Sequence, residues 1–402
     1  SSMSPGGVCP RIRPDPRARA VVAADRTAAE VMATTGASHL LVAGGGTAGH
    51  VLPALAVVEG AVAAGHDIED LHYVGSLRGV EAEMVPPTGV PFTLLRVVGL
   101  QRRLTARNLL FVPLMLGAVL ASVRLLRRRR PRVVVSVGGY ASLGPVIAAV
   151  VLRIPIVVIS YDRRPGRSSV ISARFAAACA VAFPESTLPR ATFTGAPLRR
   201  AVLGVDRLGG RASARERLGV PEDRFLVVAL GGSLGSAALN AAVADFVAER
   251  GDDAGLTVVH LVGERFLETV PGASEGSAGA QYLPSGFSDD MASLYEAADL
   301  VIGRGGASTV HEVAAVGVPS VLVPWDGAAE DHQRANVSWL ADQGGAVLLA
   351  ESELGRLGGL IDDLRSDPER RRSLAERAAE VGAVNRSGRL AELIDSVAGG
   401  DT

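Results

Sequence analysis

The sequence predicts an α/β protein built from two doubly wound halves. Short continuous apolar runs are typical of buried parallel strands, glycine-rich turns follow several of them, and helix-length amphipathic segments separate them. The pattern starts after residue 38 and starts again at residue 225. A chain of 402 residues is long enough for two or three domains of ordinary size.

In the first half we expect four parallel strands, each followed by glycine, a turn or polar residues. They are residues 39–43, 71–74, 133–137 and 156–159. Residues 1–36 are rich in proline, arginine and alanine and predict a flexible leader without a signal-peptide core. The first domain is therefore expected to span residues 37–198.

The second half repeats the same order of strand, turn and helix. Its expected strands are residues 225–230, 257–262, 299–303 and 319–324. Residues 199–223 are rich in arginine and glycine, which is typical of a linker at the floor of a cleft. The second domain is expected over residues 199–402, with a core at 224–355 and a helical tail at 356–402 that could cross back to the first domain.

The formal net charge of −1 conceals an asymmetry between the halves. The first 200 residues carry 24 arginines against 11 acidic residues, whereas residues 201–402 carry 17 against 31. The chain contains no lysine, which excludes P-loop lysine and Schiff-base chemistry. Cys9 and Cys179 offer neither a disulfide framework nor a zinc ribbon, so a reducing cytoplasm is expected.

Between Met84 and Tyr161 the chain has eleven arginines and no acidic residue. Inside this segment, residues 109–122 are uncharged, too short to span a bilayer, and interrupted by Pro113. An apolar helix flanked by arginines favours binding to an anionic membrane surface, although a buried helix beside solvated arginines remains an alternative. No aromatic residues interleave with the arginines, so nucleic acid is not an expected partner. The predicted membrane patch comprises Arg102, Arg103, Phe111, Leu114, Arg127 and Arg128.

The first glycine turn, Gly44–Gly49, has the G-x-G-x-x-G spacing of a phosphate-binding turn. A dinucleotide enzyme would place an acidic residue after the second strand, where Ser76 stands, so an oxidoreductase is the weaker alternative. His50 follows the turn at the edge where ligands of α/β sheets bind. Its imidazole could accept a proton from an attacking hydroxyl, or it could simply cap the helix.

Three loops of the second half could bind a nucleotide. Residues 231–236 offer backbone donors and hydroxyls for an anion, and residues 303–309 turn into another helix. Glu312, one turn inside that helix, could accept hydrogen bonds from a ribose diol, or be an ordinary surface residue. Asp331 and Gln333 could bind sugar hydroxyls. The acidic residues of that loop lack ligand spacing, so no metal is expected.

Together these motifs resemble the MurG family of GT-B glycosyltransferases. The resemblance rests on residues 45–50, 138–142, 195–199, 231–233, 287–291, 304–312 and 331–333, in family order from Ser38 onward. It implies two Rossmann-like domains facing a cleft, with a UDP-sugar bound mainly by the second and a prenyl-phosphate lipid acceptor by the first. It also implies inverting transfer without a metal or other cofactor, at the inner face of the cell membrane.

The resemblance assigns roles to individual residues. The donor-binding residues would be Arg199, Ser233, Ser288, Met291, Ala307, Ser308, Thr309, Glu312, Asp331 and Gln333. On the acceptor side, Thr47 and Tyr140 would line the site and His50 would be the catalytic base.

The sequence departs from the family after the strand at residues 156–159. A His-Glu-Gln-Asn-type loop is usual there, whereas this chain reads Ser-Tyr-Asp-Arg-Arg-Pro-Gly-Arg over residues 160–167. We therefore hypothesise a paralogue from a phosphoglycolipid (moenomycin-type) antibiotic pathway, whose acceptor would bind Arg163, Arg164 and Arg167. The alternatives are the family's own reaction, which makes lipid II from lipid I with UDP-GlcNAc, and a non-catalytic nucleotide-sugar sensor.

Overall fold

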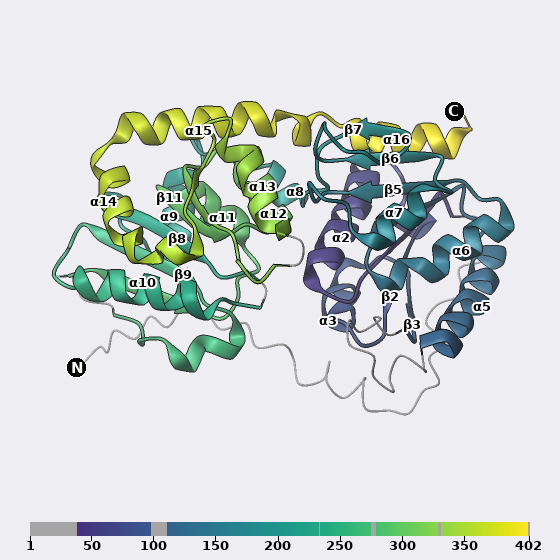
Figure 1. The fold of residues 1–402 in the computed structure, drawn as a ribbon, viewed down its shortest axis with the longest axis horizontal. Coiled ribbons are helices and arrows are strands. Elements are labelled where there is room, and N and C mark those ends of the chain that lie inside the picture. The colour runs from purple at the N-terminus through teal and green to yellow at the C-terminus, as the bar shows by residue number, and fades with distance from the viewer. Residues whose placement is uncertain (1–37, 98–110, 233, 275–278, 329–330, 401–402) are drawn as a thin grey trace, which may run out of the picture. The chain divides into compact units, whose positions relative to one another are not determined.

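A computed structural model describes residues 38–97, 111–232, 234–274, 279–328 and 331–400, and the side chain of Phe111 lies outside this set. These residues form two parallel β-sheets, each covered by helices (Figure 1). The predicted α/β class with two doubly wound sheets is confirmed.

The first sheet has the strand order β3-β2-β1-β4-β5-β6-β7, and every pair is parallel. The order reverses between β1 and β4, so their carboxyl ends flank the switch point at which such sheets bind ligands. The strands are β1 (Leu40–Gly44), β2 (Leu71–Ser76), β3 (Phe92–Leu95), β4 (Val133–Gly138), β5 (Ile156–Ser160), β6 (Ala178–Val181) and β7 (Ala191–Phe193).

Both faces of this sheet are buried because successive side chains point to opposite sides. Leu40 and Val42 face one cluster, which α2 completes, whereas Leu41 and Ala43 face a second, which α5 and α6 complete. The helices are α2 (Ala48–Ala63), α3 (Glu81–Met84), α5 (Phe111–Arg129), α6 (Leu143–Leu152) and α7 (Arg167–Ala173).

The second sheet has the order β10-β9-β8-β11-β12-β13, with its switch point between β8 and β11. Its strands are β8 (Phe225–Leu230), β9 (Leu256–Leu261), β10 (Gln281–Ser285), β11 (Leu300–Arg304), β12 (Ser320–Val323) and β13 (Val347–Leu348). Its helices are α8 (Arg200–Leu203), α9 (Arg211–Leu218), α10 (Ala237–Glu249), α11 (Met291–Ala297), α12 (Ala307–Val316) and α13 (His332–Ala341).

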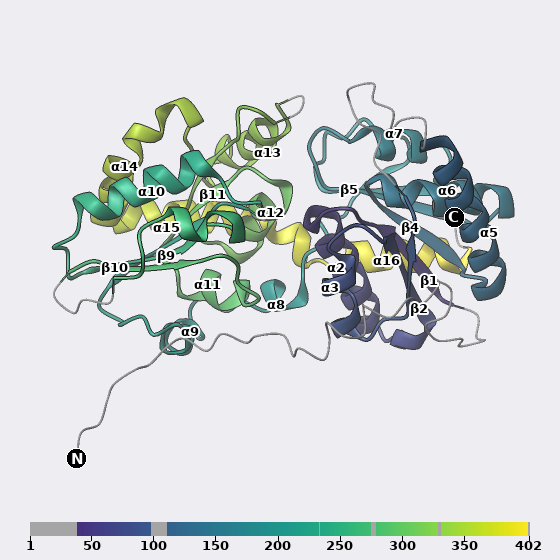
Figure 2. The same cartoon turned by 90° about the horizontal axis from the view of Figure 1, so that it is seen from below.

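The chain ends in three helices, α14 (Leu357–Ser366), α15 (Pro368–Gly382) and α16 (Arg389–Gly399). Helix α14 packs on α10 and α15 packs on α12, both beside the second sheet. Helix α16 instead packs against α2 and β4 to β6 of the first half (Figure 2). Ile394 and Val397 bury its apolar stripe there.

The segment expected as a linker, residues 199–223, contains α8 and α9, and its buried Arg215 pairs with Asp299 at 2.6 Å. Pro113 does not interrupt the apolar run, since it lies in the first turn of α5, where proline is tolerated. In the described part of the chain, no helix combines the length and apolar character needed to cross a bilayer.

Candidate functional site

Two glycine turns meet at the switch point of the first sheet. Gly46 has φ +101°, and a Cβ there would lie 2.6 Å from the Tyr140 ring. Gly139 has φ +77°, and a Cβ there would lie 2.5 Å from the carbonyl oxygen of Gly45. Only glycine permits this approach. The turns thereby bring the predicted residues Tyr140 and His50 together.

His50 is half-buried in the first turn of α2. Its Nδ1 lies 3.1 Å from Thr47 Oγ1. The phenol of Tyr161 donates to the Gly49 carbonyl at 2.6 Å and so holds the turn from the β5 side. Burial lowers the pKa of His50, while the charges of Asp162 and Glu81 act in the opposite direction. A lowered pKa keeps the imidazole unprotonated at neutral pH, as a general base requires.

Glu81 is a residue that the sequence reasoning missed. Its side chain is fully buried, and Oε1 accepts hydrogen bonds from Gly46 N–H at 2.8 Å and Ser76 N–H at 2.7 Å. A carboxylate therefore does lie at the end of β2, as in a dinucleotide-binding fold. It belongs to Glu81, five residues after Ser76. The sequence feature that could have indicated Glu81 is the short Gly79-Val80-Glu81 segment, which follows the strand at residues 71–76.

The loop after β5 contacts the second half. Arg163 N–H donates to Asn336 Oδ1 at 2.9 Å, its guanidinium donates to Ala335 O at 3.2 Å, and its Nε pairs with Glu185 at 2.7 Å. Arg164 and Arg167 are exposed. A cavity of about 420 Å³ lies here, and it is lined by Arg163, Arg164, Glu185, Asp331, Arg334, Ala335 and Ser338. A cavity of about 470 Å³ beside α10 contains no predicted site residue.

Helix α12 begins at the switch point of the second sheet. Ala307 is buried, and Ser308 and Thr309 are half-buried in its first turn, where backbone N–H groups are free to bind an anion. One turn on, Glu312 Oε2 accepts a hydrogen bond from the Tyr295 phenol at 2.7 Å. Burial raises the pKa of Glu312 to about 7, although Tyr295 and the Arg199 charge oppose the rise.

Arg304 at the end of β11 is a second charged residue to which the sequence gave no role. It is 7% exposed, and its guanidinium donates to Ser236 Oγ from Nε at 3.0 Å and to Glu351 Oε1 from Nη2 at 2.5 Å. Ser236 also caps α10 by accepting from Leu239 N–H. This network fixes the loop after β8 against the end of β11.

The remaining predicted donor residues make contacts within the chain. Arg199 Nε pairs with Glu59 Oε1 at 2.5 Å. Gln333 Oε1 accepts from Trp325 N–H at 2.9 Å, and Asp331 is exposed, 3.8 Å from Arg334.

Ser288 and Met291 lie around the start of α11. Ser288 Oγ accepts from Asp290 N–H at 3.2 Å, and half-buried Met291 opens the helix. Ser233 lies outside the described residues.

The predicted membrane patch is described in part. Leu114 is half-buried and Arg127 and Arg128 are exposed, whereas Arg102, Arg103 and the side chain of Phe111 lie outside the described set. Helix α5 exposes a stripe that the prediction did not list, with Val112 70%, Leu116 60% and Leu120 49% exposed. Helices α6 and α7 add further exposed apolar side chains, namely Ile147, Val150, Val151, Val170 and Ile171, and Phe175 follows in the turn after α7.

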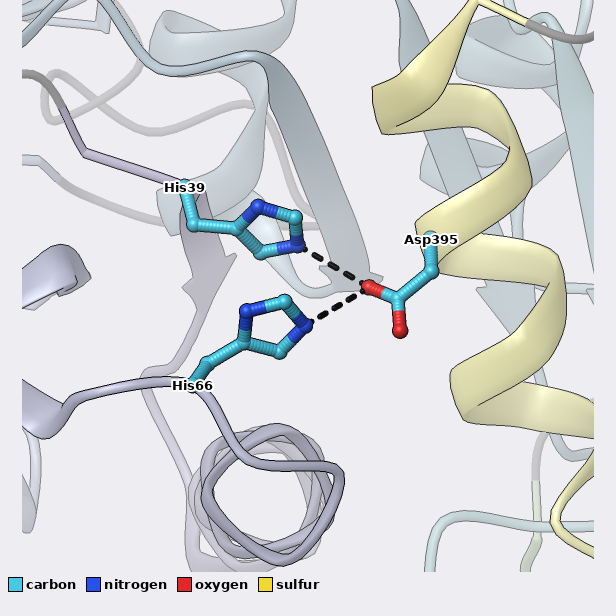
Figure 3. Close-up of side chains that lie close together, drawn as sticks. All are labelled: His39, His66 and Asp395. Atoms are coloured by element: carbon cyan, nitrogen blue, oxygen red, sulfur yellow. Dashed lines mark hydrogen bonds and ion pairs between the residues drawn. The ribbon is translucent and has the colours of Figure 1, made fainter.

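A histidine pair holds α16 on the first half (Figure 3). His39 Nε2 and His66 Nε2 lie 2.9 Å and 3.0 Å from the same Asp395 oxygen. The rings stack at 3.7 Å with an interplanar angle of 16°. The ligand atoms of His39, His66 and Asp395 all lie within 4.8 Å of one another, so this cluster could also hold a metal ion.

Comparisons with known proteins match both halves. The glycosyltransferase family 28 N-terminal domain matches residues 40–181, and the glycosyltransferase family 28 C-terminal domain matches residues 226–394. A relative from Desulforudis audaxviator (strain MP104C) is 36% identical over 377 residues, covering 90% of this chain and all of its own. It is named UDP-N-acetylglucosamine–N-acetylmuramyl-(pentapeptide) pyrophosphoryl-undecaprenol N-acetylglucosamine transferase.

A protein of the same name from Nocardioides sp. (strain ATCC BAA-499 / JS614) is 38% identical over 360 residues, covering 89% of this chain and 97% of its own. The crystal structure of MurG from Acinetobacter baumannii aligns with a TM-score of 0.66 at 26% identity, covering 90% of this chain and 99% of that one. The chain therefore belongs to glycosyltransferase family 28 and is a MurG-family, UDP-sugar-dependent transferase with the GT-B fold.

Proposed function

We propose that the enzyme transfers N-acetylglucosamine from UDP-N-acetylglucosamine to a pyrophosphoryl-undecaprenol-linked N-acetylmuramyl pentapeptide. The observation that carries this proposal is the near-complete coverage of relatives named for that reaction, up to 100% of their length. They support the family's own reaction over the antibiotic-pathway paralogue.

The donor site lies at the switch point of the second sheet. The N–H groups that open α12, at Ala307 to Thr309, face the diphosphate, and the helix dipole favours its charge. Glu312 accepts the two ribose hydroxyls, while its second contact, with Tyr295, holds the carboxylate in place. Arg199, Asp331 and Gln333 complete the predicted donor set, and none of these groups requires a metal.

The acceptor site lies at the two glycine turns of the first sheet. An acceptor hydroxyl oxygen forms a bond to the anomeric carbon as the bond from that carbon to the UDP oxygen breaks, with inversion. His50 Nε2 takes the hydroxyl proton, and UDP leaves with the bonding electron pair. Thr47 orients the imidazole through Nδ1. Tyr140 lines the same turn, against Gly46.

The acceptor's lipid tail requires the enzyme to work at a membrane surface. Exposed Val112, Leu116 and Leu120 form one stripe of α5, at spacings of four residues, and Arg127 and Arg128 follow on the same helix. We expect the apolar stripe of α5 to insert into the membrane surface while its arginines contact anionic headgroups. We therefore place the enzyme at the inner face of the cell membrane.

A panel of UDP-sugars and lipid acceptors, read by UDP release, tests the reaction. We expect turnover with UDP-N-acetylglucosamine and a short-chain lipid I analogue, unchanged by EDTA. Absence of transfer to that acceptor, or loss of activity on chelation, would contradict the proposal.

The phosphoglycolipid paralogue remains a second candidate because residues 160–167 differ from the family loop. Arg163 supports it poorly, since its main chain and guanidinium already bind Asn336, Ala335 and Glu185. Exposed Arg167 fits an acidic acceptor. Preferred transfer to a prenyl-phosphate acceptor without peptide, in the same panel, would favour this candidate.

A further inference from the structure

His39, His66 and Asp395 form a cluster outside the proposed reaction site (Figure 3). His39 stands immediately before β1 and His66 follows α2, so both lie at the edge of the first sheet where its parallel strands begin. His50 and the glycine turns lie at the opposite edge, where the strands end. The cluster is therefore separated from the proposed chemistry by the length of β1.

The three ligand atoms of the cluster already converge. The Nε2 atoms of His39 and His66 lie 2.9 Å and 3.0 Å from the same Asp395 oxygen, and all three atoms lie within 4.8 Å of one another. A tetrahedral zinc ion with bonds of about 2.0 Å separates its ligand atoms by about 3.3 Å. Small outward shifts of these side chains are therefore enough to admit an ion.

The backbone holds each of the three residues in place. The N–H of His39 donates to the Asp70 carbonyl at 2.7 Å, and the N–H of His66 donates to the Ala61 carbonyl at 3.1 Å. Asp395 lies inside α16, whose apolar stripe is buried against the first half. Ligands that are already ordered lose little conformational entropy when an ion binds.

The donor set selects the class of metal. Imidazole nitrogens and a carboxylate oxygen are ligands of zinc and related transition metals, whereas Mg²⁺ and Ca²⁺ prefer oxygen ligands alone. Within the described part of the chain, no hydrogen bond engages Nδ1 of His39 or His66. Each ring can therefore carry its proton on Nδ1 and present the Nε2 lone pair to an ion.

Partial exposure gives an ion access to the cluster. The side chains of His39, His66 and Asp395 are 14%, 25% and 39% exposed. The two rings stack at 3.7 Å, and this exposure gives them room to turn apart until both lone pairs aim at one ion. A water molecule can then complete a tetrahedral set of three protein ligands.

We propose that His39, His66 and Asp395 bind one transition-metal ion of the zinc class, which fastens helix α16 to the first half of the molecule. Asp395 stands 329 residues after His66, so the ion closes a long loop between distant parts of the chain. It stabilises only the conformation in which α16 is seated, because the ligands separate when the helix leaves.

Calorimetry with ZnCl₂ tests the site on the full chain, after treatment with EDTA and dialysis. We expect one ion per chain. Asp395→Asn and His66→Gln should each bind zinc at least about tenfold more weakly, since even partners outside the ligand set have effects of that size. Glu392→Gln is the matched control, because Glu392 is exposed on the same helix, and it should match the wild type. Absence of zinc binding, or wild-type affinity in both ligand variants, would overturn the proposal.

Hydrogen exchange tests the fastening of α16. At a zinc concentration 100 times the dissociation constant, exchange along α16 in the wild type should slow by about 100-fold. Asp395→Asn should show no slowing by zinc, and its exchange without zinc reports whether the helix is still seated. Mg²⁺ at the same concentration should leave the wild type unchanged. Equal slowing by Mg²⁺, or slowing by zinc in Asp395→Asn, would contradict the proposal.

Cobalt(II), a paramagnetic ion that binds the same ligand types, identifies the ligands directly. In the NMR spectrum it should shift the ring protons of His39 and His66 far more than those of His50. Larger shifts at His50 would place the ion elsewhere and overturn the proposal. Turnover should be the same with and without zinc, because the proposed reaction takes place at the opposite edge of the sheet.

Discussion

The two sheets share one topology at their switch points but carry buried side chains of opposite charge there. Beneath the first glycine turn lies the carboxylate of Glu81, and beside the second lies the guanidinium of Arg304. The Glu81 carboxylate accepts a hydrogen bond from the N–H of a phosphate-type turn and has no ion-pair partner among the described residues, whereas the Arg304 guanidinium is paired with Glu351. Similar glycine spacing therefore accompanies different buried charged groups at the two switch points.

Removing the base should have the largest effect. His50→Ala is expected to lower turnover by about 10²–10⁴-fold, because the acceptor hydroxyl loses its general base. The KM for the UDP-sugar should stay unchanged, since the proposed donor site lies at the other sheet. Steady-state kinetics check this, with His66→Gln, remote from the glycine turns, as control. Unaltered turnover in His50→Ala would remove the catalytic role from the first switch point.

Removing the cation tests the second switch point. Arg304→Met leaves Glu351 without its buried partner and should lower the free energy of unfolding by about 3–5 kcal/mol. Urea denaturation measures the loss. Glu353→Gln is the matched control, because it removes an exposed ion pair from the same segment and should cost about 0.5 kcal/mol or less. Equal effects of the two variants would show that burial of Arg304 has no special importance.

Glu312→Gln should weaken UDP binding by about 1–3 kcal/mol through loss of a charged acceptor. Since the pKa of Glu312 is about 7, the wild type should also bind UDP about tenfold more weakly at pH 6 than at pH 8. Calorimetry at both pH values checks this, and Glu312→Gln should show no such dependence. If the wild type binds UDP with the same affinity at both pH values, Glu312 does not contact the nucleotide.

The raised pKa also predicts a stability change with a definite sign. The fold favours protonated Glu312, so its stabilising contribution is full below the usual value of 4.5 and is lost as pH rises through about 7. Bound UDP should restore the stability that the protein loses as Glu312 ionises. Thermal unfolding with and without UDP, at pH 6 and pH 8, measures both parts.

The smallest effect is expected away from both switch points. Asp395→Asn weakens the hydrogen bonds from His39 and His66 and should cost about 1 kcal/mol or less. Hydrogen exchange along α16 should quicken while turnover stays unchanged. Glu392→Gln, exposed on the same helix, is the control. A fall in turnover would mean that the terminal helix influences the site chemistry.

The strands that sequence predicted are those with continuous apolar runs, such as β1, β4, β8 and β11. The strands it missed are shorter or less distinctive. β13 has two residues at a sheet edge, and β6 reads Ala-Cys-Ala-Val, which lacks the bulky β-branched pattern. β13 is only half-buried at the sheet edge, whereas β6 is a buried interior strand whose small side chains give a weak strand signal.

The glycine turns were predictable because backbone conformation restricts the residue type, whereas the side chains around them were not. Glu81 reaches the first turn through a fold in the chain after β2, and Arg304 meets Glu351 from 47 positions away. Arg163 is the opposite case, a residue to which sequence reasoning gave a ligand although its partners lie within the protein. Its charge suggested an acidic ligand, but packing against α13 gives it partners inside the protein.

Helix α16 constrains how hybrid enzymes of this family can be assembled. The last helix completes the hydrophobic layer of the first sheet through Ile394 and Val397, although it follows the second sheet in the chain. A hybrid joined midway between the sheets would seat that helix on a foreign surface. A hybrid that takes its first half from one enzyme must therefore also take helix α16 from that enzyme.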